Sequence, residues 1–132
     1  MWGAARVDPF GMTTFTAAGT VLDALAVRDF ARLEETLDPA VQGRALLPPG
    51  HRDYDGAGAL VAAFRTWFGE ASSFELLDAV VGEIGGRVHL RWRLRVERGN
   101  GPEVIEQQVY ADCGPDGRLT RFDLLCSGFR PE

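Results

Sequence analysis

Several residue types are scarce in this chain of 132 residues, and each scarcity excludes a kind of chemistry. All 14 cationic residues are arginine, so Schiff-base chemistry on a lysine amine is excluded. The two cysteines and two histidines lack the close spacing of zinc ligands, so we expect no metal site. A glycine-rich phosphate loop is also missing, and no cofactor is expected.

The two cysteines are not expected to form a disulfide. Cys113 lies at a predicted hairpin turn, whereas Cys126 lies well along the returning strand. A disulfide needs alpha carbons within about 7 Å, and an extended strand separates these two residues much further. We therefore expect two free thiols.

Long apolar runs and a basic surface are missing as well. No apolar run approaches the roughly 18 residues of a membrane span, and the first residues lack the cationic start and apolar block of a secretory signal. The net charge of −5 argues against nucleic acid, since such binding depends on neutralising phosphates. We expect a cytoplasmic protein with neither nucleic acid nor a membrane as a partner.

The strongest pattern present is a strict alternation between residues 86 and 98. Its polar positions are Arg87, His89, Arg91, Arg93, Arg95 and Glu97, and its apolar positions are Val88, Leu90, Trp92, Leu94 and Val96. A period of two predicts a strand with one buried face. A long antiparallel strand of this kind needs a sheet around it and helices on its apolar side.

The rest of the chain predicts one domain over residues 13–130, preceded by an N-terminal arm over residues 1–12. Helices are predicted over 14–26, 30–37 and 56–68, and strands over 41–47, 74–84, 86–98, 103–112 and 118–126. Helices that come first and strands that follow indicate an α+β fold.

Specific residues are predicted to set the ends of the second helix and the start of the third. Asp29 is placed to cap the second helix, and the Asp38-Pro39 pair is expected to end it, because a residue before proline avoids helical geometry. Residues 51–55 are interpreted as a polar loop, and Asp55 is placed to cap the third helix.

Several local phrases, in this order, resemble the nuclear-transport-factor-2-like superfamily and in particular its SnoaL-like branch. They are LDAL at 22–25, RDFARL at 28–33, LDPAV at 37–41, DG at 55–56 with ALVAAF at 59–64, and DGRLTRF at 116–122. The resemblance covers residues 14–128. It implies three N-terminal helices packed on a strongly curved, mainly antiparallel sheet that forms a cone with a central pocket.

The resemblance also implies candidate activities, because members of the superfamily include ketosteroid isomerases, epoxide hydrolases and polyketide cyclases. The isomerases place a carboxylate base where this chain has Arg44, which cannot abstract a proton at neutral pH. The hydrolases place an Arg-x-Asp pair on a central strand and a second aspartate on the last strand, whereas Arg91, Arg93 and Arg95 have no carboxylate between them. The cyclase type pairs an acidic residue with a histidine.

The candidate catalytic residues for such acid–base chemistry are Glu106, Asp123 and His51. Asp123 faces outward if Phe122 and Leu124 face inward, and a bulge after Leu119 would reverse this. His51 lies in the predicted loop that could border the pocket, although an ordinary polar loop is the alternative.

The favoured inward set on the strand over 103–112 is Glu106, Gln108 and Tyr110, since burial would raise the pKa of a glutamate and suit it to acid–base work. The alternative is that Glu106 pairs with arginines of a neighbouring strand. The candidate substrate-binding residues are Tyr54, Phe64, Trp67, Trp92, Gln108 and Tyr110.

Two functions remain open from the sequence. The first is a pocket protein for a small apolar molecule, with cofactor-independent acid–base chemistry of the polyketide cyclase type if it is an enzyme. The second is a non-catalytic ligand-binding or dimerisation module. In either case we expect a homodimer through the outer sheet face that carries Arg91, Arg93 and Arg95.

Overall fold

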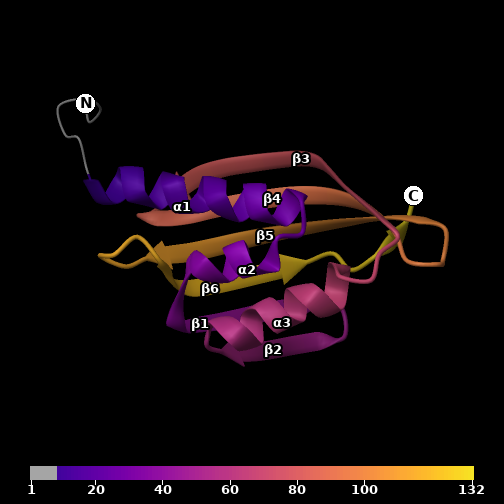
Figure 1. Ribbon diagram of the computed structural model, residues 1–132, viewed down its shortest axis with the longest axis horizontal. Helices are drawn as coiled ribbons and strands as arrows, with labels where there is room; N and C mark the ends of the chain where they lie inside the picture. The colour runs from indigo at the N-terminus through magenta and orange to yellow at the C-terminus, as the bar shows by residue number, and fades with distance from the viewer. Residues whose placement is uncertain (1–8) are drawn as a thin grey trace.

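The structure of the chain, a computed structural model, describes residues 9–132. The structure has three helices and seven strands within these residues, and all but the short β7 are labelled in Figure 1. Along the chain they are α1 (Pro9–Ala26), α2 (Phe30–Glu35), β1 (Leu37–Leu47), β2 (Gly50–Asp55), α3 (Ala57–Phe68), β3 (Ser73–Ile84), β4 (Arg87–Glu97), β5 (Pro102–Cys113), β6 (Leu119–Cys126) and β7 (Arg130–Pro131).

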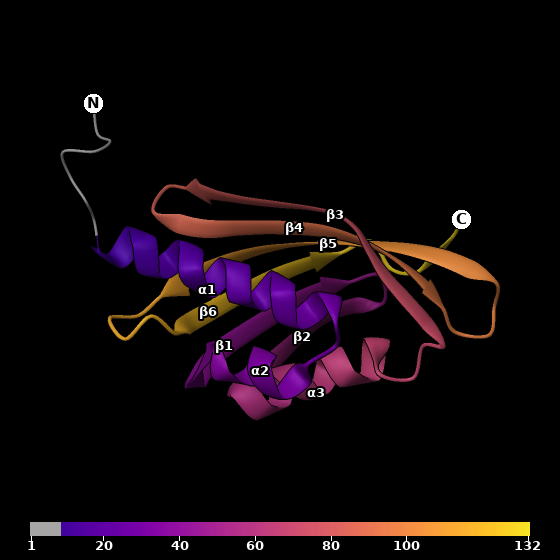
Figure 2. The ribbon, with the colours of Figure 1, turned by 45° about the horizontal axis from the view of Figure 1, so that its top comes forward.

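The strands form a single mixed sheet in the order β2-β1-β6-β5-β4-β3, and the short β7 pairs with β5. The β1–β6 pair is parallel and every other pair is antiparallel. The three helices lie on one side of this curved sheet (Figures 1 and 2). The predicted α+β fold, with helices packed on a curved and mainly antiparallel sheet, is confirmed.

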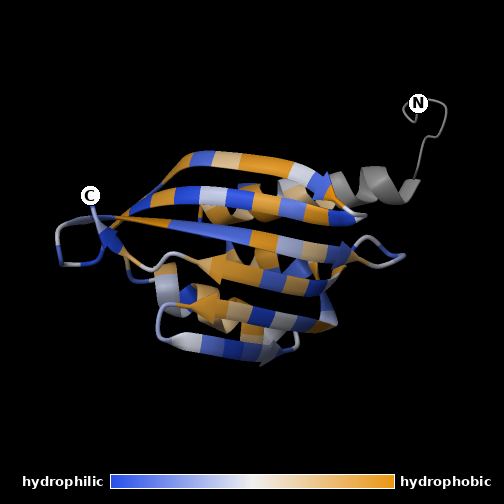
Figure 3. Ribbon diagram, turned by 180° about the vertical axis from the view of Figure 1, so that it is seen from behind, coloured by the Kyte–Doolittle hydropathy of each residue, from blue (hydrophilic) through white to orange (hydrophobic). Residues whose placement is uncertain are grey.

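The alternation in β4 is also confirmed. Leu90, Trp92 and Leu94 are fully buried beneath the helices, while the arginines between them lie on the outer face. Hydrophilic and hydrophobic residues accordingly alternate along this strand when the sheet is seen from behind (Figure 3). Burial of one face is what gives the strand its register, because a shift by one residue would expose the whole apolar set.

Side chains fill the concave side of the sheet. The ring of Phe64 from α3 lies 6.3 Å from that of Trp92 and 6.1 Å from that of Phe122, and it also packs against Phe68 at 6.2 Å. All four side chains are fully buried. Among the described side chains, these aromatic rings fill the space between Trp92 and α3.

Several predicted boundaries are wrong near the N-terminus. Residues 1–8 of the predicted arm lie outside the described residues, and residues 9–12 belong to α1. The second helix ends at Glu35, with Thr36 as its C-cap, so Pro39 lies inside β1 rather than at the end of a helix. Asp29 caps α2 as predicted, since its side chain accepts a hydrogen bond from the Arg32 backbone N–H.

The predicted polar loop over residues 51–55 is instead a strand. The Pro48-Pro49-Gly50 turn reverses the chain, and β2 then pairs antiparallel with β1 along its whole length. A strand at the edge of a sheet, exposed on most positions, has no apolar periodicity to reveal it. The cap of α3 is Gly56, which has a φ of 92° and offers no side-chain hydrogen bond, so the predicted cap by Asp55 is wrong.

The two thiols are free, as the spacing predicted. Cys113 opposes Leu119 at the start of β6, whereas Cys126 opposes Gln107 at the other end of that strand. Among the described helices, none combines the length and the apolar character needed to cross a bilayer.

Arg28 joins α1 to α3 from a strained backbone position. It follows the last turn of α1 with a φ of 55°, a left-handed conformation that costs a residue with a side chain about 1–2 kcal/mol. Its Nη1 donates to the carbonyls of Phe68 and Ala71 at 3.0 and 2.8 Å, and its guanidinium lies 5.2 Å from the Phe74 ring. These contacts offset the strain, because they satisfy carbonyls at the end of α3.

We expect Arg28→Ala to lower the free energy of unfolding by about 2 kcal/mol, because it removes hydrogen bonds from a charged group and keeps the left-handed backbone. Arg28→Gly removes the same hydrogen bonds but relieves the backbone strain, so it should be more stable than Arg28→Ala by about 1 kcal/mol. Urea unfolding of the three proteins measures both differences. Equal stability of the two variants would show that the backbone conformation stores no strain.

Candidate ligand groove

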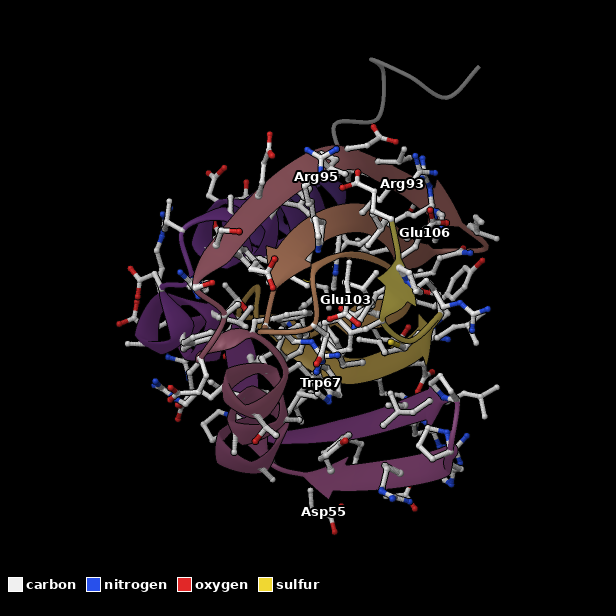
Figure 4. The ribbon with its side chains drawn as sticks, turned by 90° about the vertical axis from the view of Figure 1, so that its right-hand side faces the viewer. Asp55, Trp67, Arg93, Arg95, Glu103 and Glu106 are labelled. Carbon is white, nitrogen blue, oxygen red and sulfur yellow. The ribbon has the colours of Figure 1, made fainter. Side chains whose placement is uncertain are left out.

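A groove of about 380 Å³ opens at the end of the sheet where β1 and β6 finish and the β4–β5 hairpin begins. The residues that line it are Leu47, Pro48, Pro49, Trp67, Arg98, Ile105, Cys126, Ser127, Gly128, Phe129 and Arg130. Figure 4 looks at the molecule from this end, with Trp67 and Glu103 toward the middle of the view. The groove is mainly apolar, which is typical of a small-molecule site.

Trp67 forms one wall of the groove, and other aromatic rings hold it in place. Its ring lies 5.1 Å from that of Phe64 and 6.5 Å from that of Tyr54, both in edge-on arrangements. Burial raises the pKa of the Tyr54 hydroxyl, although the charge on Arg52 opposes the effect. Trp67 is half-buried, so it presents apolar surface to the groove from a fixed position.

A chain of hydrogen bonds runs from the core to the floor of the groove. The indole N–H of Trp92 donates to Gln107 Oε1 at 2.8 Å, and Gln107 Nε2 donates to Cys126 Sγ at 3.4 Å. The backbone N–H of Gly128 donates to the same sulfur at 3.3 Å. Gln107 is completely buried, and a buried amide is tolerated because both of its ends have partners.

Arg98 and Glu103 form an ion pair at the side of the groove, across the tight turn between β4 and β5. Arg98 Nε and Nη2 donate to the two carboxylate oxygens of Glu103 at 2.9 and 3.2 Å. The Arg98 guanidinium also lies 3.6 Å from the centre of the Phe129 ring. Glu103 is buried, so this pair is held from two sides.

The segment over residues 127–132 closes the outer side of the groove. β7 pairs with β5, and Glu132 binds Arg95 with a shortest contact of 2.6 Å. Gly128 is required for this path, because its φ is 79° and a Cβ there would lie 2.6 Å from the ring of Pro48. The segment therefore follows a single path over the loop at the end of β1.

The predicted substrate-binding residues divide into two groups. Trp67 lines the groove, Tyr54 supports it, and Phe64 and Trp92 lie behind it in the core. Gln108 and Tyr110 lie elsewhere, as described next.

The predicted inward face of β5 is wrong. Ile105, Gln107 and Val109 are the buried positions, so Glu106, Gln108 and Tyr110 lie on the outer face. Figure 4 shows Glu106 there with Arg93 and Arg95, away from Trp67. Both faces of this strand contain a glutamine, so its polar pattern did not reveal which face is buried.

The alternative prediction for Glu106 is confirmed: it pairs with arginines of the neighbouring strand β4. Its carboxylate lies 3.1 Å from Arg93 and 3.6 Å from Arg91. His89 and Tyr110 stack on the same face with ring centres 4.8 Å apart. These side chains are therefore paired with one another rather than directed toward the groove.

Asp123 also faces outward. A register irregularity does occur in β6 after Leu119, but it brings both Leu119 and Phe122 to the buried side and leaves Asp123 outside. Asp123 Oδ2 accepts from Arg87 at 2.9 Å, while its Oδ1 is buried without a hydrogen bond. Arg87 also pairs with Asp112 at 2.7 Å, so it holds two carboxylates at once.

His51 lies in edge strand β2 rather than in a loop, opposite Leu46 of β1. Its ring is exposed, and its Nε2 lies 3.1 Å from Asp53. The three predicted catalytic residues thus do not converge on one point of the described structure. Within residues 16–132, no three His, Cys, Asp or Glu side chains gather in a way that would hold a metal ion.

Sequence reasoning missed Arg98, Glu103 and Gln107 as parts of a site. For Glu103 and Gln107 the alternation along β5 was an available signal. Glu103 and Gln107 share the phase of Ile105 and Val109 along β5, so they belong to its buried face. The position of Arg98 depends on the hairpin turn, which no pattern of hydrophobicity describes.

Comparisons with known proteins bear on the fold. No family model matches the sequence, and no curated protein matches it by sequence. Among solved structures, an NTF2-like protein of unknown function from Burkholderia pseudomallei superposes with a TM-score of 0.68 at 19% identity, covering 85% of this chain and 88% of that one. The chain has the NTF2-like fold.

Two other structures with this fold have names that state an activity. A Xanthomonas campestris protein, for which polyketide cyclase activity is a proposed assignment, matches with a TM-score of 0.70 at 18% identity, over 88% of this chain and 91% of that one. An LEH-like epoxide hydrolase from M. tuberculosis matches with a TM-score of 0.66 at 18% identity, over 88% of this chain and 84% of that one. At such identities the likeness confirms the predicted NTF2-like resemblance as a fold.

The pairing of Glu132 with Arg95 predicts a pH dependence for the segment that closes the groove. Hydrogen bonds from Arg95 lower the pKa of the Glu132 carboxyl below its usual range, and the positive charge adds to the effect while desolvation opposes it. Because the folded-state pKa is the lower one, the pair stabilises this segment above the unfolded-state pKa. That stabilisation is lost as the pH falls through the folded-state value.

Carbon-13 NMR titration of the Glu132 carboxyl group measures this shift. We expect Arg95→Gln to raise the pKa of Glu132 toward its usual range. Arg93→Gln is the matched control, since Arg93 pairs with Glu106 instead, and it should leave the Glu132 value unchanged. An unaltered Glu132 pKa in Arg95→Gln would contradict the assigned cause.

Proposed function

We propose that this chain binds a small apolar molecule in the groove without catalysing a reaction on it. The observation that carries this proposal is the apolar groove itself, with Trp67 as a supported wall and Leu47 and Ile105 beside it. Other proteins with this fold are named as a cyclase and an epoxide hydrolase, which act on small molecules, and this supports binding in a general way.

The distribution of titratable groups supports binding rather than acid–base chemistry. None of the eleven residues that line the groove is Asp, Glu or His. Glu106 and Asp123 lie on the opposite face of the sheet and are paired with arginines. A general acid or base must lie within hydrogen-bond reach of its substrate, directly or through one water, and these groups do not meet that condition for a ligand in the groove.

Alkylation of Cys126 tests the proposal, because this thiol lines the groove and Cys113 does not. The background variant is Cys113→Ser, in which Cys126 is the remaining thiol, and the probe ligand is 2-naphthalenemethanol, a neutral aromatic alcohol. At ten times its Kd the probe should slow the reaction of Cys126 with iodoacetamide about tenfold, because only protein with an empty groove reacts. Trp67→Ala should weaken this protection, because an aromatic wall contributes much of the contact area.

The matched control is Cys126→Ser, in which Cys113 is the remaining thiol. The same probe should leave the rate of Cys113 alkylation unchanged, since that residue ends β5 opposite Leu119, at the other end of β6 from Cys126. Protection of both thiols would indicate nonspecific association. Failure of the probe and of a series of related aromatic compounds to protect Cys126 would refute the groove as a binding site.

We also propose that the chain forms a homodimer through the outer sheet face. The predicted contacts need revision, because Arg91, Arg93 and Arg95 are all paired with acidic residues of their own chain. Apolar side chains on the same face support the proposal instead. Leu46 and Leu125 are neighbours in register across β1 and β6, and they are 54% and 49% exposed.

Light scattering tests this dimer. For the wild type we expect twice the 14.4 kDa mass of one chain. For Leu125→Glu we expect the mass of a single chain, because a dimer would have to bury the new glutamate of each protomer in its interface. Val27→Glu is the control, since Val27 is 71% exposed beyond the end of α1 and should leave the mass unchanged. A wild-type mass of one chain at micromolar concentration would disprove the dimer.

A further inference from the structure

Among the described residues, the groove has one uncompensated positive charge, that of Arg130, because Glu103 at its side neutralises Arg98. The chain has a net charge of −5, yet two of the residues that line the groove are arginines and none is acidic. Local charge of one sign in a concave site attracts ligands of the other sign. This contrast remains unexplained if the groove binds a purely apolar molecule.

We infer that the ligand is a small aromatic carboxylate, whose ring lies against Trp67 and whose carboxylate binds Arg130 and Arg98. The inference rests on the proposed function, since it names the ligand class of the same groove. It differs from that proposal in requiring a negative charge on the ligand.

Arg130 provides the uncompensated charge. It lies in β7 opposite Val104, it is exposed, and within the described part of the chain its side chain has no hydrogen bond or ion pair. The nearest acidic residue in sequence, Glu132, is already bound by Arg95 through three hydrogen bonds. An incoming anion would therefore be the first ion-pair partner of Arg130.

Arg98 provides a fixed donor rather than extra charge. Its Nε and Nη2 donate hydrogen bonds to Glu103, and Phe129 packs against the guanidinium plane. These contacts hold the Arg98 side chain in one orientation. Its Nη1 has no partner among the described residues and remains available as a donor. A donor that is already held in place loses little conformational freedom on binding, which favours affinity.

A carboxylate suits these two donors better than a neutral polar group does. Hydrogen bonds from a guanidinium to a carboxylate are charge-assisted and roughly twice as strong as neutral ones. A second pocket shows the contrast, since it lies between β1 and β2 and has two arginines balanced by two aspartates: Arg44, Arg121, Asp53 and Asp55. In the lining of the groove both charged residues are arginines, and Arg130 has no carboxylate to balance it among the described residues.

Isothermal titration with 2-naphthoate and 2-naphthalenemethanol tests the inference, because the two probes differ in charge and have nearly the same shape. We expect 2-naphthoate to bind about tenfold more tightly than the alcohol at low salt, and the difference to shrink as salt is added. Arg130→Gln should remove most of that tenfold preference, because the affinity for 2-naphthoate should fall much more than the affinity for the alcohol.

Arg44→Gln is the matched control, since Arg44 is also exposed but lies away from the groove, and it should leave both affinities unchanged. Because Arg98→Gln alone would leave Glu103 buried without its partner, the double variant Arg98→Gln/Glu103→Gln tests the second donor. It should weaken 2-naphthoate binding several-fold while thermal unfolding stays cooperative.

The outcomes separate this inference from the proposed function. Equal affinity for the two probes, with Cys126 protected by both, would overturn the anionic ligand and leave the groove as a binding site. Binding of neither probe would remove both proposals. If Arg130→Gln still bound 2-naphthoate more tightly than the alcohol, the inference would also be overturned, because a cation other than Arg130 would then bind the carboxylate.

Discussion

The buried contact between Trp92 and the ring of Phe64 is the constraint on which the rest of this structure depends. It joins the centre of the sheet to α3, and with Phe122 it fills the space under the helices. Interiors of proteins are close-packed, and the groove lies beside this packed cluster rather than within it. The hydrogen bond from Trp92 to Gln107 then places an amide beside Cys126, at the floor of the groove.

The two faces of the sheet use arginine in different ways. On the outer face, Arg87, Arg91 and Arg93 each meet a carboxylate of a neighbouring strand, so their charges are satisfied within the chain. Exposed ion pairs of this kind add little stability individually, but they set which residues face one another. At the groove, Arg98 is held by a buried glutamate, and the side chain of Arg130 has no ion-pair partner within the part of the chain that the structure describes.

Much of the fold could be predicted from the sequence, because it rests on local periodicity. The alternation around Trp92 identified β4 and its buried face, and Asp29 marked the start of α2. Predictions failed where periodicity was absent or ambiguous. β2 has no apolar face, and β5 has polar residues on both faces, so the sequence could not show that Gln107 is the buried amide and Gln108 the exposed one.

By itself the sequence determined most of the helices and strands, their order along the chain, and the buried face of β4. These features follow from the local spacing of the apolar side chains that are buried on folding. Only the tertiary structure decided the position of the groove. Leu47, Trp67, Ile105 and Phe129 come from four separate parts of the chain, and they meet only because the sheet curves and the segment after β6 returns across its end. Contacts between residues so distant in sequence leave no local pattern, so nothing in the sequence pointed to this end of the sheet.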